Sequence, residues 1–205
     1  DAGRARRARR LRPGAAEMSL VIGYCDALTG KVWMASDGLA TFGCAQVETV
    51  KIRRYHGDLL VGTTGLHRLN NIILDLHAPT AELPGRLANP YAFAVRFAQD
   101  LRVRCKDAGI LTVNKEGQED MGGRVLLGYN GRLFGVSSDF AVIEHAPWWA
   151  IGCGCEWAEG ALAALDKLKT SLTPRDRLLF VLELVASRDI HVAPPYTVLS
   201  SGATE

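Results

Sequence analysis

The chain has 205 residues, of which 48% are hydrophobic and 22% charged, a composition typical of one globular domain with a sizeable core. The formal net charge of +2 gives no overall basic character, which argues against a nucleic-acid partner. No apolar run approaches the roughly 20 residues that span a bilayer, and the first residues lack the apolar core of a secretory signal. We therefore expect neither nucleic acid nor a membrane as a partner.

The N-terminal segment differs from the rest of the chain in charge. Residues 1–17 hold six arginines and two acidic residues, so the remainder has 18 basic and 20 acidic residues and a net charge of −2. We expect residues 1–18 to be an Arg-rich extension and residues 19–205 to be the folded domain. The origin of the extension is open among a cleaved propeptide, an organelle-targeting presequence, a nucleic-acid-binding arm and sequence upstream of a translation start at Met18.

Short alternating runs bounded by turn residues follow Met18. Residues 19–26 and 31–37 are predicted to form one β-hairpin, and residues 49–55 and 58–64 a second. The first part of the domain is therefore expected to be β-rich.

Two helices are predicted next, because residues 66–77 and 90–107 each place apolar side chains on one face. Asn89-Pro90 adds a start signal to the second helix, with a capping residue followed by proline at the first helical position.

The second half of the domain repeats this order. Three strands are predicted at 123–129, 132–137 and 140–144, with Asn130-Gly131 as the turn between the first two. Two helices and a strand complete the chain, at about 155–169, 173–187 and 196–200. This order favours an α+β fold, either a four-layer α-β-β-α sandwich of two antiparallel sheets flanked by helix pairs or a generic α+β domain.

Five cysteines are scattered along the chain at positions 25, 44, 105, 153 and 155. An odd, scattered set is typical of reduced thiols, so a cytoplasmic location is expected. Cys153 and Cys155 are close enough in sequence to bind a metal, but no second Cys/His pair has ligand spacing. We expect neither a metal nor an organic cofactor.

A hydroxyl and a carboxylate stand at the ends of predicted strands, at Ser19 and Asp37, and a lysine stands within the next one, at Lys51. A hydroxyl is a weak nucleophile that needs a base within hydrogen-bond reach. If Ser19 were an N-terminus, its own α-amine would supply that base. Lys51 would favour the neutral amine and stabilise developing negative charge, and Asp37 would orient the lysine.

Five segments in the same order resemble proteasome β-type subunits, including bacterial HslV-type peptidases. They are Asp37–Gly43, Thr49–Ile52, Leu59–Gly65, Ala150–Leu162 and Arg188-Asp189. The resemblance extends from Ser19 to about Val198. It implies the fold of the N-terminal nucleophile hydrolases and a peptidase in which the hydroxyl of the first residue attacks the scissile carbonyl.

The resemblance also implies catalytic roles for single residues. Ser19 matches the family's catalytic threonine, Lys51 would tune it and Asp37 would pair with Lys51. Gly65 falls where the family supplies an oxyanion-hole N–H. Two further catalytic candidates are Asp189, which matches an acidic residue near the nucleophile, and Cys153, which stands where the family usually has serine.

Substrate contacts are implied in the same way. Thr41 falls on the strand that pairs with extended substrate, and the pocket for the substrate side chain would be lined by Ala40, Thr49, Thr63 and His67. By resemblance, the subunits would form a homo-oligomeric ring or stacked rings that enclose the sites and cleave unfolded peptides. An ATPase ring activator is implied by analogy alone.

Four departures from the family keep other functions open. The nucleophile is serine instead of threonine, Met18 stands in place of glycine, Cys153 replaces serine, and no serine follows Asp189. A catalytically inactive structural subunit and a small-molecule amidase of the same fold are therefore the alternatives to a peptidase.

Overall fold

The computed structural model of the protein describes residues 19–42, 45–55, 58–75 and 89–202. The extension expected at residues 1–18 and the end of the first predicted helix, 76–77, lie outside these residues.

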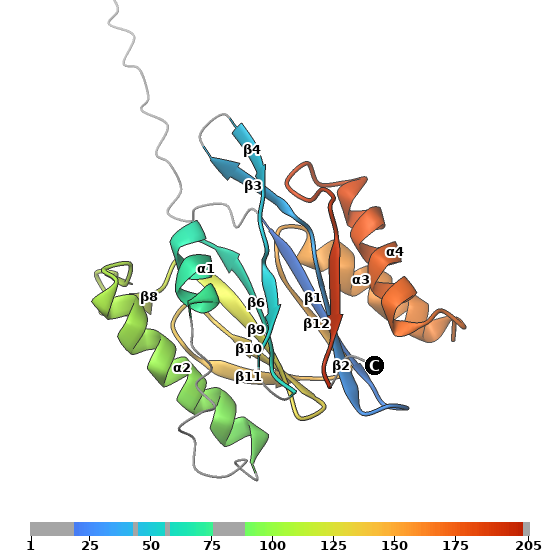
Figure 1. Cartoon of the computed structure of the whole chain (residues 1–205), viewed down its shortest axis with the longest axis horizontal. Coiled ribbons are helices and arrows are strands. Elements are labelled where there is room, and N and C mark those ends of the chain that lie inside the picture. Colours follow the sequence, from blue (N-terminus) through green and yellow to red (C-terminus); the bar gives the residue numbers. More distant parts are fainter. Residues whose placement is uncertain (1–18, 43–44, 56–57, 76–88, 203–205) are drawn as a thin grey trace, which may run out of the picture.

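Two antiparallel sheets occupy the centre of the molecule (Figure 1). The first has the order β12-β1-β2-β13, with β1 Leu20–Asp26, β2 Lys31–Ser36, β12 Trp148–Gly152 and β13 Thr197–Ser200. The second has the order β11-β10-β9-β6-β5, with β5 Ile52–Arg54, β6 Leu60–Gly65, β9 Gly123–Tyr129, β10 Arg132–Val136 and β11 Val142–His145. Two small ladders join β3 Leu39–Phe42 to β4 Ala45–Glu48 and β7 Thr112–Val113 to β8 Glu119–Asp120.

The described helices are α1 His67–Leu74, α2 Pro90–Asp107, α3 Cys155–Lys167 and α4 Pro174–Ala186. Two of them begin as their sequences predict. The Asn89 side chain accepts hydrogen bonds from the N–H groups of Tyr91 (3.0 Å) and Ala92 (3.3 Å) ahead of α2. The Thr173 hydroxyl accepts one from the Asp176 N–H (3.1 Å) ahead of α4. Each cap satisfies main-chain donors that have no partner inside the helix.

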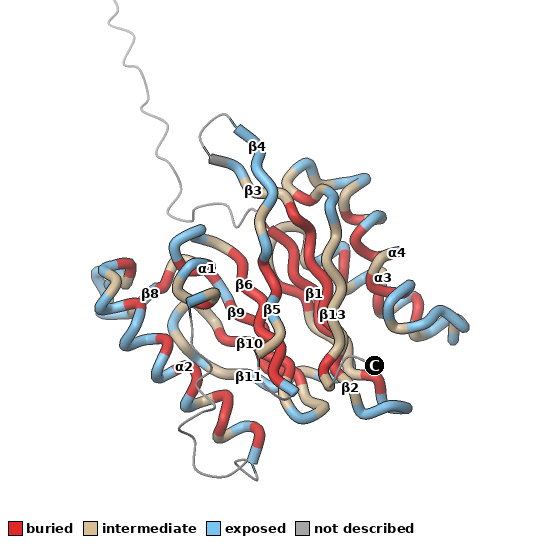
Figure 2. Tube along the Cα trace, viewed as in Figure 1, coloured by how far each residue is buried: buried red, intermediate tan, exposed pale blue. Residues whose placement is uncertain are grey.

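Three apolar clusters hold these elements together, and Figure 2 shows the buried residues of the strands and helices in red. The first packs α1 and α2 against the five-stranded sheet, the second lies between the two sheets, and the third packs α3 and α4 against the four-stranded sheet. Strand β9 shows how one sequence serves two clusters. Val125 and Leu127 belong to the first and Leu126 to the second, because successive side chains of a strand point to opposite faces.

The α+β class and the two antiparallel sheets predicted from the sequence are confirmed, and α2 spans the predicted 90–107. Some strands were missed. Trp148–Gly152 forms β12 through its pairing with β1. The sequence did not predict this strand, because a short apolar run without alternation can belong to a strand or to a helix. The β3–β4 and β7–β8 ladders were also missed. Among the described residues, no helix is both long and apolar enough to cross a bilayer.

Candidate active site

Ser19 is held by the main chain at the start of β1. Its carbonyl accepts a hydrogen bond from the Cys153 N–H (2.7 Å), and its exposed fraction is 6%. Gly152 lies opposite with φ +98°, and a Cβ there would stand 1.8 Å from the Ser19 carbonyl oxygen. Only glycine permits this approach. The end of β12 therefore determines where Ser19 sits.

A buried ion pair lies next to this position. Lys51 Nζ donates to both carboxylate oxygens of Asp37, at 2.8 Å each, and to the carbonyl of Leu39. The exposed fractions of the two charged side chains are 3% and 0%. Asp37 also accepts from the N–H groups of Leu20 (2.8 Å) and Leu39 (3.1 Å). Since Leu20 is bonded to Ser19, the carboxylate ties the lysine to the main chain beside the candidate nucleophile.

Burial acts on both members of the pair. It raises the pKa of Asp37, against the opposing effects of Lys51 and of the N–H groups of Leu20 and Leu39. It lowers the pKa of Lys51, against the opposing effect of Asp37. We assign the pair as ionised, because the ammonium and two N–H groups converge on one carboxylate and hydrogen bonds to the charged form favour it. Lys51 is thus a desolvated cation that is stabilised mainly by Asp37.

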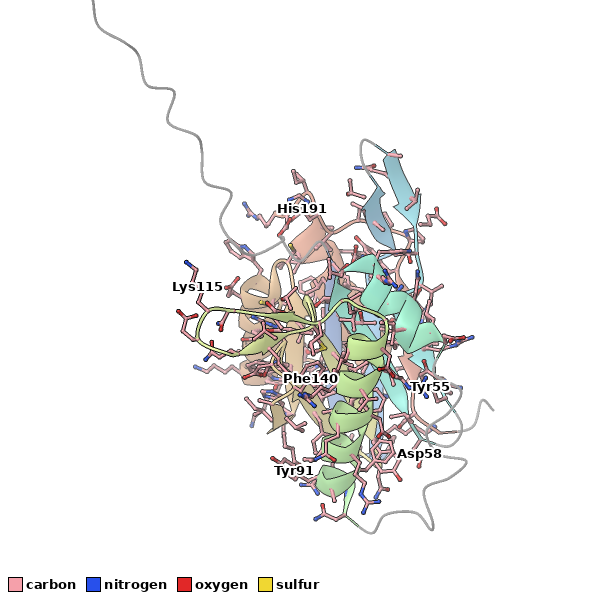
Figure 3. All side chains as sticks on the ribbon, turned by 90° about the vertical axis from the view of Figure 1, so that its left-hand side faces the viewer. Tyr55, Asp58, Tyr91, Lys115, Phe140 and His191 are labelled. Carbon is pink, nitrogen blue, oxygen red and sulfur yellow. The ribbon has the colours of Figure 1, made fainter. Side chains whose placement is uncertain are left out.

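The other predicted catalytic residues lie around the turn after β12. Cys153 is close enough to Lys51 to contribute to the pKa of the lysine. Asp189 lies beside Gly154, since a Cβ on that glycine would stand 3.6 Å from Asp189 Oδ2. Asp189 Oδ1 accepts a hydrogen bond from the His191 N–H (2.9 Å), and His191 is found at the end of the molecule from which the β3–β4 hairpin projects (Figure 3).

Gly65, the predicted oxyanion donor, ends β6 with φ +97°. A Cβ there would stand 2.3 Å from the Gly122 carbonyl oxygen, so glycine is required for the two strands to approach. Thr64 precedes Gly65 and lies close to Gly152, the glycine that contacts Ser19. A Cβ placed on Gly152 would stand 2.8 Å from Thr64 Cγ2. The sequence placed Thr64 in a segment, Thr63–Gly65, that could be a strand end or an oxyanion loop, and it assigned Thr64 no role of its own.

The predicted substrate contacts occupy two places. Ala40 and Thr41 lie on β3, paired with Val47 and Gln46 of the exposed strand β4, and this hairpin projects from the body (Figure 1). The others, Thr49, Thr63 and His67, lie around the start of α1. Thr63 is buried, His67 is exposed at the first turn of the helix, and the Thr49 N–H donates to Gly38 (2.9 Å). Their binding roles stay predictions.

Two further contacts near Lys51 and Asp37 were not predicted from the sequence. Asn70 of α1 donates to the carbonyl of Val50 (2.9 Å), one residue before Lys51. The segment after Asp189 reaches the site as well. The Gly38 N–H donates to the Ala193 carbonyl (3.2 Å), and a Cβ on Gly38 would stand 2.5 Å from the Pro195 carbonyl oxygen. For Asn70 a signal existed, a polar residue between apolar residues on the packed face of a predicted helix.

A cavity of about 580 Å³ lies elsewhere, between the β7–β8 ladder, the β10–β11 turn and the stacked rings of His145 and Trp149. Among the described residues, those that line it do not include Ser19, Asp37 or Lys51. We place the candidate site at Ser19 because the desolvated ion pair lies there, and perturbed titratable groups cluster at functional sites.

No protein-family model and no curated protein matches the chain. Solved structures do. The BPH protein of Thiobacillus denitrificans, in complex with epoxomicin, is 22% identical with a TM-score of 0.74, over 91% of this chain and 100% of that one. The HslV of Trypanosoma brucei is 16% identical with a TM-score of 0.67, over 88% of this chain and 98% of that one.

The chain has a proteasome-like N-terminal nucleophile hydrolase fold. Anbu of Yersinia bercovieri shares this fold at 16% identity and a TM-score of 0.64, over 89% and 81%. The resemblance noted in the sequence is thus confirmed at the level of the fold.

Proposed function

We propose that the protein is a self-compartmentalising endopeptidase of the proteasome-like fold, with Ser19 as its N-terminal nucleophile once residues 1–18 are removed. Its scaffold is a four-layer α-β-β-α sandwich. One observation above all supports this proposal. The buried Asp37–Lys51 pair is tied through the Leu20 N–H to the residue that follows Ser19.

Cleavage of the Met18–Ser19 bond would give Ser19 the base that it lacks. The freed α-amine takes the hydroxyl proton while the oxygen attacks the scissile carbonyl, and it then gives the proton to the leaving amine. The resulting ester is hydrolysed by water, again with the amine as base. Lys51 keeps the amine neutral through its positive charge.

The remaining groups act on charge and position. The Gly65 N–H stabilises the oxyanion, an effect that is large in a site without water. Asp37 holds Lys51, while Cys153 and Asp189 support the turn beside Ser19. Extended substrate pairs with Thr41 on β3, and its side chain enters the pocket of Ala40, Thr49, Thr63 and His67.

Assembly into a homo-oligomer is part of the proposal. One similar structure, at 16% identity and a TM-score of 0.65, is described as a helical assembly of the Anbu complex from Pseudomonas aeruginosa. We propose a ring or stacked rings of this chain in the cytoplasm, with an ATPase ring as a possible activator. The chemistry above needs no cofactor.

Removal of the Ser19 hydroxyl tests the proposal. The protein is isolated as it is processed in cells, its N-terminus is determined by mass spectrometry, and a panel of fluorogenic peptides is assayed. We expect Ser19 at the N-terminus and loss of turnover by at least about a hundredfold in Ser19→Ala. Ser187→Ala is the matched control, because Ser187 is exposed at the end of α4.

The same preparation is incubated with epoxomicin, the ligand of the Thiobacillus denitrificans structure. We expect epoxomicin to bind the processed wild type and not Ser19→Ala, as measured by intact mass and by a shift in melting temperature. Peptide turnover that survives in Ser19→Ala would refute the assignment.

A non-catalytic structural subunit is the second candidate. Two observations favour it, the thiol of Cys153 where the family has a hydroxyl, and the Ala193–Pro195 segment that follows Asp189 without a serine. An assembled particle in which residues 1–18 remain attached would support this candidate, because Ser19 would then have an amide in place of the amine.

A further inference from the structure

Asn70 has an unusual environment for a side chain with no role assigned above. It lies on the packed face of α1 with Leu69 and Ile73, and its exposed fraction is 6%. Its Nδ2 donates to the Val50 carbonyl (2.9 Å) and lies 3.5 Å from the Thr49 hydroxyl. Its Oδ1 is buried and has no hydrogen-bond partner among the described residues.

The segment that Asn70 contacts leads directly to Lys51. Thr49, Val50 and Lys51 connect β4 to β5, and three hydrogen bonds hold their main chain. The Thr49 N–H donates to Gly38 (2.9 Å), and the Lys51 carbonyl accepts from the Thr63 N–H (3.0 Å). Between them, the Val50 carbonyl accepts from Asn70. The middle attachment is thus made by a side chain and the outer two by the main chain.

We propose that Asn70 is a positioning residue that fixes the Thr49–Lys51 segment and thereby holds the Lys51 ammonium at Asp37 beside Ser19. The inference rests on the proposed function. Lys51 Nζ makes its contacts at 2.8 Å from each Asp37 oxygen, so a small shift of its main chain separates the charges. A misplacement of about 1 Å in a catalytic arrangement costs on the order of a hundredfold in rate.

The unsatisfied Oδ1 supports a role beyond packing. A buried acceptor without a donor costs free energy that an apolar side chain of the same shape avoids. Leucine has nearly that shape, so packing of α1 alone favours leucine at this position. Asparagine supplies what leucine lacks, the donor for Val50.

Asn70→Leu tests the inference. We expect the fold to be retained, kcat of peptide hydrolysis to fall by about ten- to a hundredfold, and KM to change by less than about threefold. Asn71→Ala is the matched control, since Asn71 is exposed on the same helix. Asn70→Asp is the second variant, because its ionised carboxylate keeps the shape but has no hydrogen to donate, and it is expected to show the same loss of kcat.

The state of Lys51 is measured separately, so that the test does not depend on activity. The lysine resonances of isotope-labelled protein are titrated, and Lys51 is assigned with Lys51→Met. The titratable groups that act on Lys51 are Asp37 and Cys153, and burial lowers its pKa. Burial is the largest influence on the pKa of Lys51, and a loosened segment admits water, so this pKa should rise toward its ordinary value in Asn70→Leu, which adds no charge.

The outcomes separate the two proposals. An unchanged Lys51 titration in folded Asn70→Leu and an unchanged kcat in folded Asn70→Leu or Asn70→Asp would overturn the positioning role. Turnover that survives in Ser19→Ala would overturn the peptidase proposal, and the Lys51 titration would still decide for or against Asn70.

Discussion

The Lys51–Asp37 and Arg177–Asp166 ion pairs differ in burial and in what they connect. The side chains of Lys51 and Asp37 have exposed fractions of 3% and 0%, whereas those of Arg177 and Asp166 have 8% and 35%. Removing two charges from water is costly, and attraction between them repays the cost only with further hydrogen bonds. The half-exposed Asp166 keeps part of its hydration, so the second pair is the less costly one.

The Arg177–Asp166 pair belongs to a network that joins secondary-structure elements. Asp166 on α3 accepts a hydrogen bond from the Trp148 indole of β12 (2.8 Å), and the Arg177 guanidinium of α4 lies 5.1 Å from the ring centroid of Tyr24 on β1. The pair therefore fastens the two helices to the four-stranded sheet. These contacts give the Arg177–Asp166 pair a structural role.

The Lys51–Asp37 pair connects loops at the start of β1 and contacts the main chain next to Ser19. No helix is fastened by the contacts described for it. Complete burial at the candidate nucleophile, compared with partial burial in the helix network, suggests that the first pair is retained for chemistry.

The largest effect is expected from Lys51→Met, which leaves the Asp37 carboxylate buried without its partner. We expect a loss of about 3–5 kcal/mol in the free energy of unfolding and loss of peptide turnover. Unfolding in urea and the peptide assay measure the two. The double variant Asp37→Asn, Lys51→Met should regain most of the stability and none of the activity. If it regained activity, the pair would be structural.

Arg177→Met should have a smaller effect, because Asp166 is partly hydrated and keeps the Trp148 donor. We expect a loss of about 1–3 kcal/mol, with turnover per folded molecule unchanged. Urea unfolding and the peptide assay at a temperature where the variant is folded provide the measurements. Turnover that fell as far as in Lys51→Met would remove the distinction between the two pairs.

The smallest effect concerns His145, a partly buried titratable group whose ring stacks on that of Trp149 with 3.7 Å between the ring centroids. Burial lowers the pKa of His145 below its ordinary value of 6.5. The unfolded chain then binds a proton at a higher pH than the folded chain does, so stability falls as the pH drops below about 6.5. His145→Phe should show a smaller decrease in melting temperature between pH 7 and pH 5. His67→Gln, at an exposed position, should behave like the wild type.

Much of the fold was predictable because local signals agreed with it. Asn89-Pro90 placed the start of α2, and the Asn130-Gly131 turn placed β9 and β10. Strand β12 was not predictable, since Trp148–Gly152 becomes a strand through its pairing with β1. The hairpin of β3 and β4 likewise depends on its register, with Ala40 opposite Val47.

The residue types of the candidate site and their spacing can be read from the sequence, with Ser19 and Asp37 at the ends of predicted strands and Lys51 within the next strand. The way in which these residues come together depends on tertiary contacts. The approach of Gly152 to Ser19, the burial of the ion pair and the contact between Asn70 and Val50 join residues distant in the chain. Such contacts depend on the packing of sheets and helices, and a local pattern contains no information about the partner across the core.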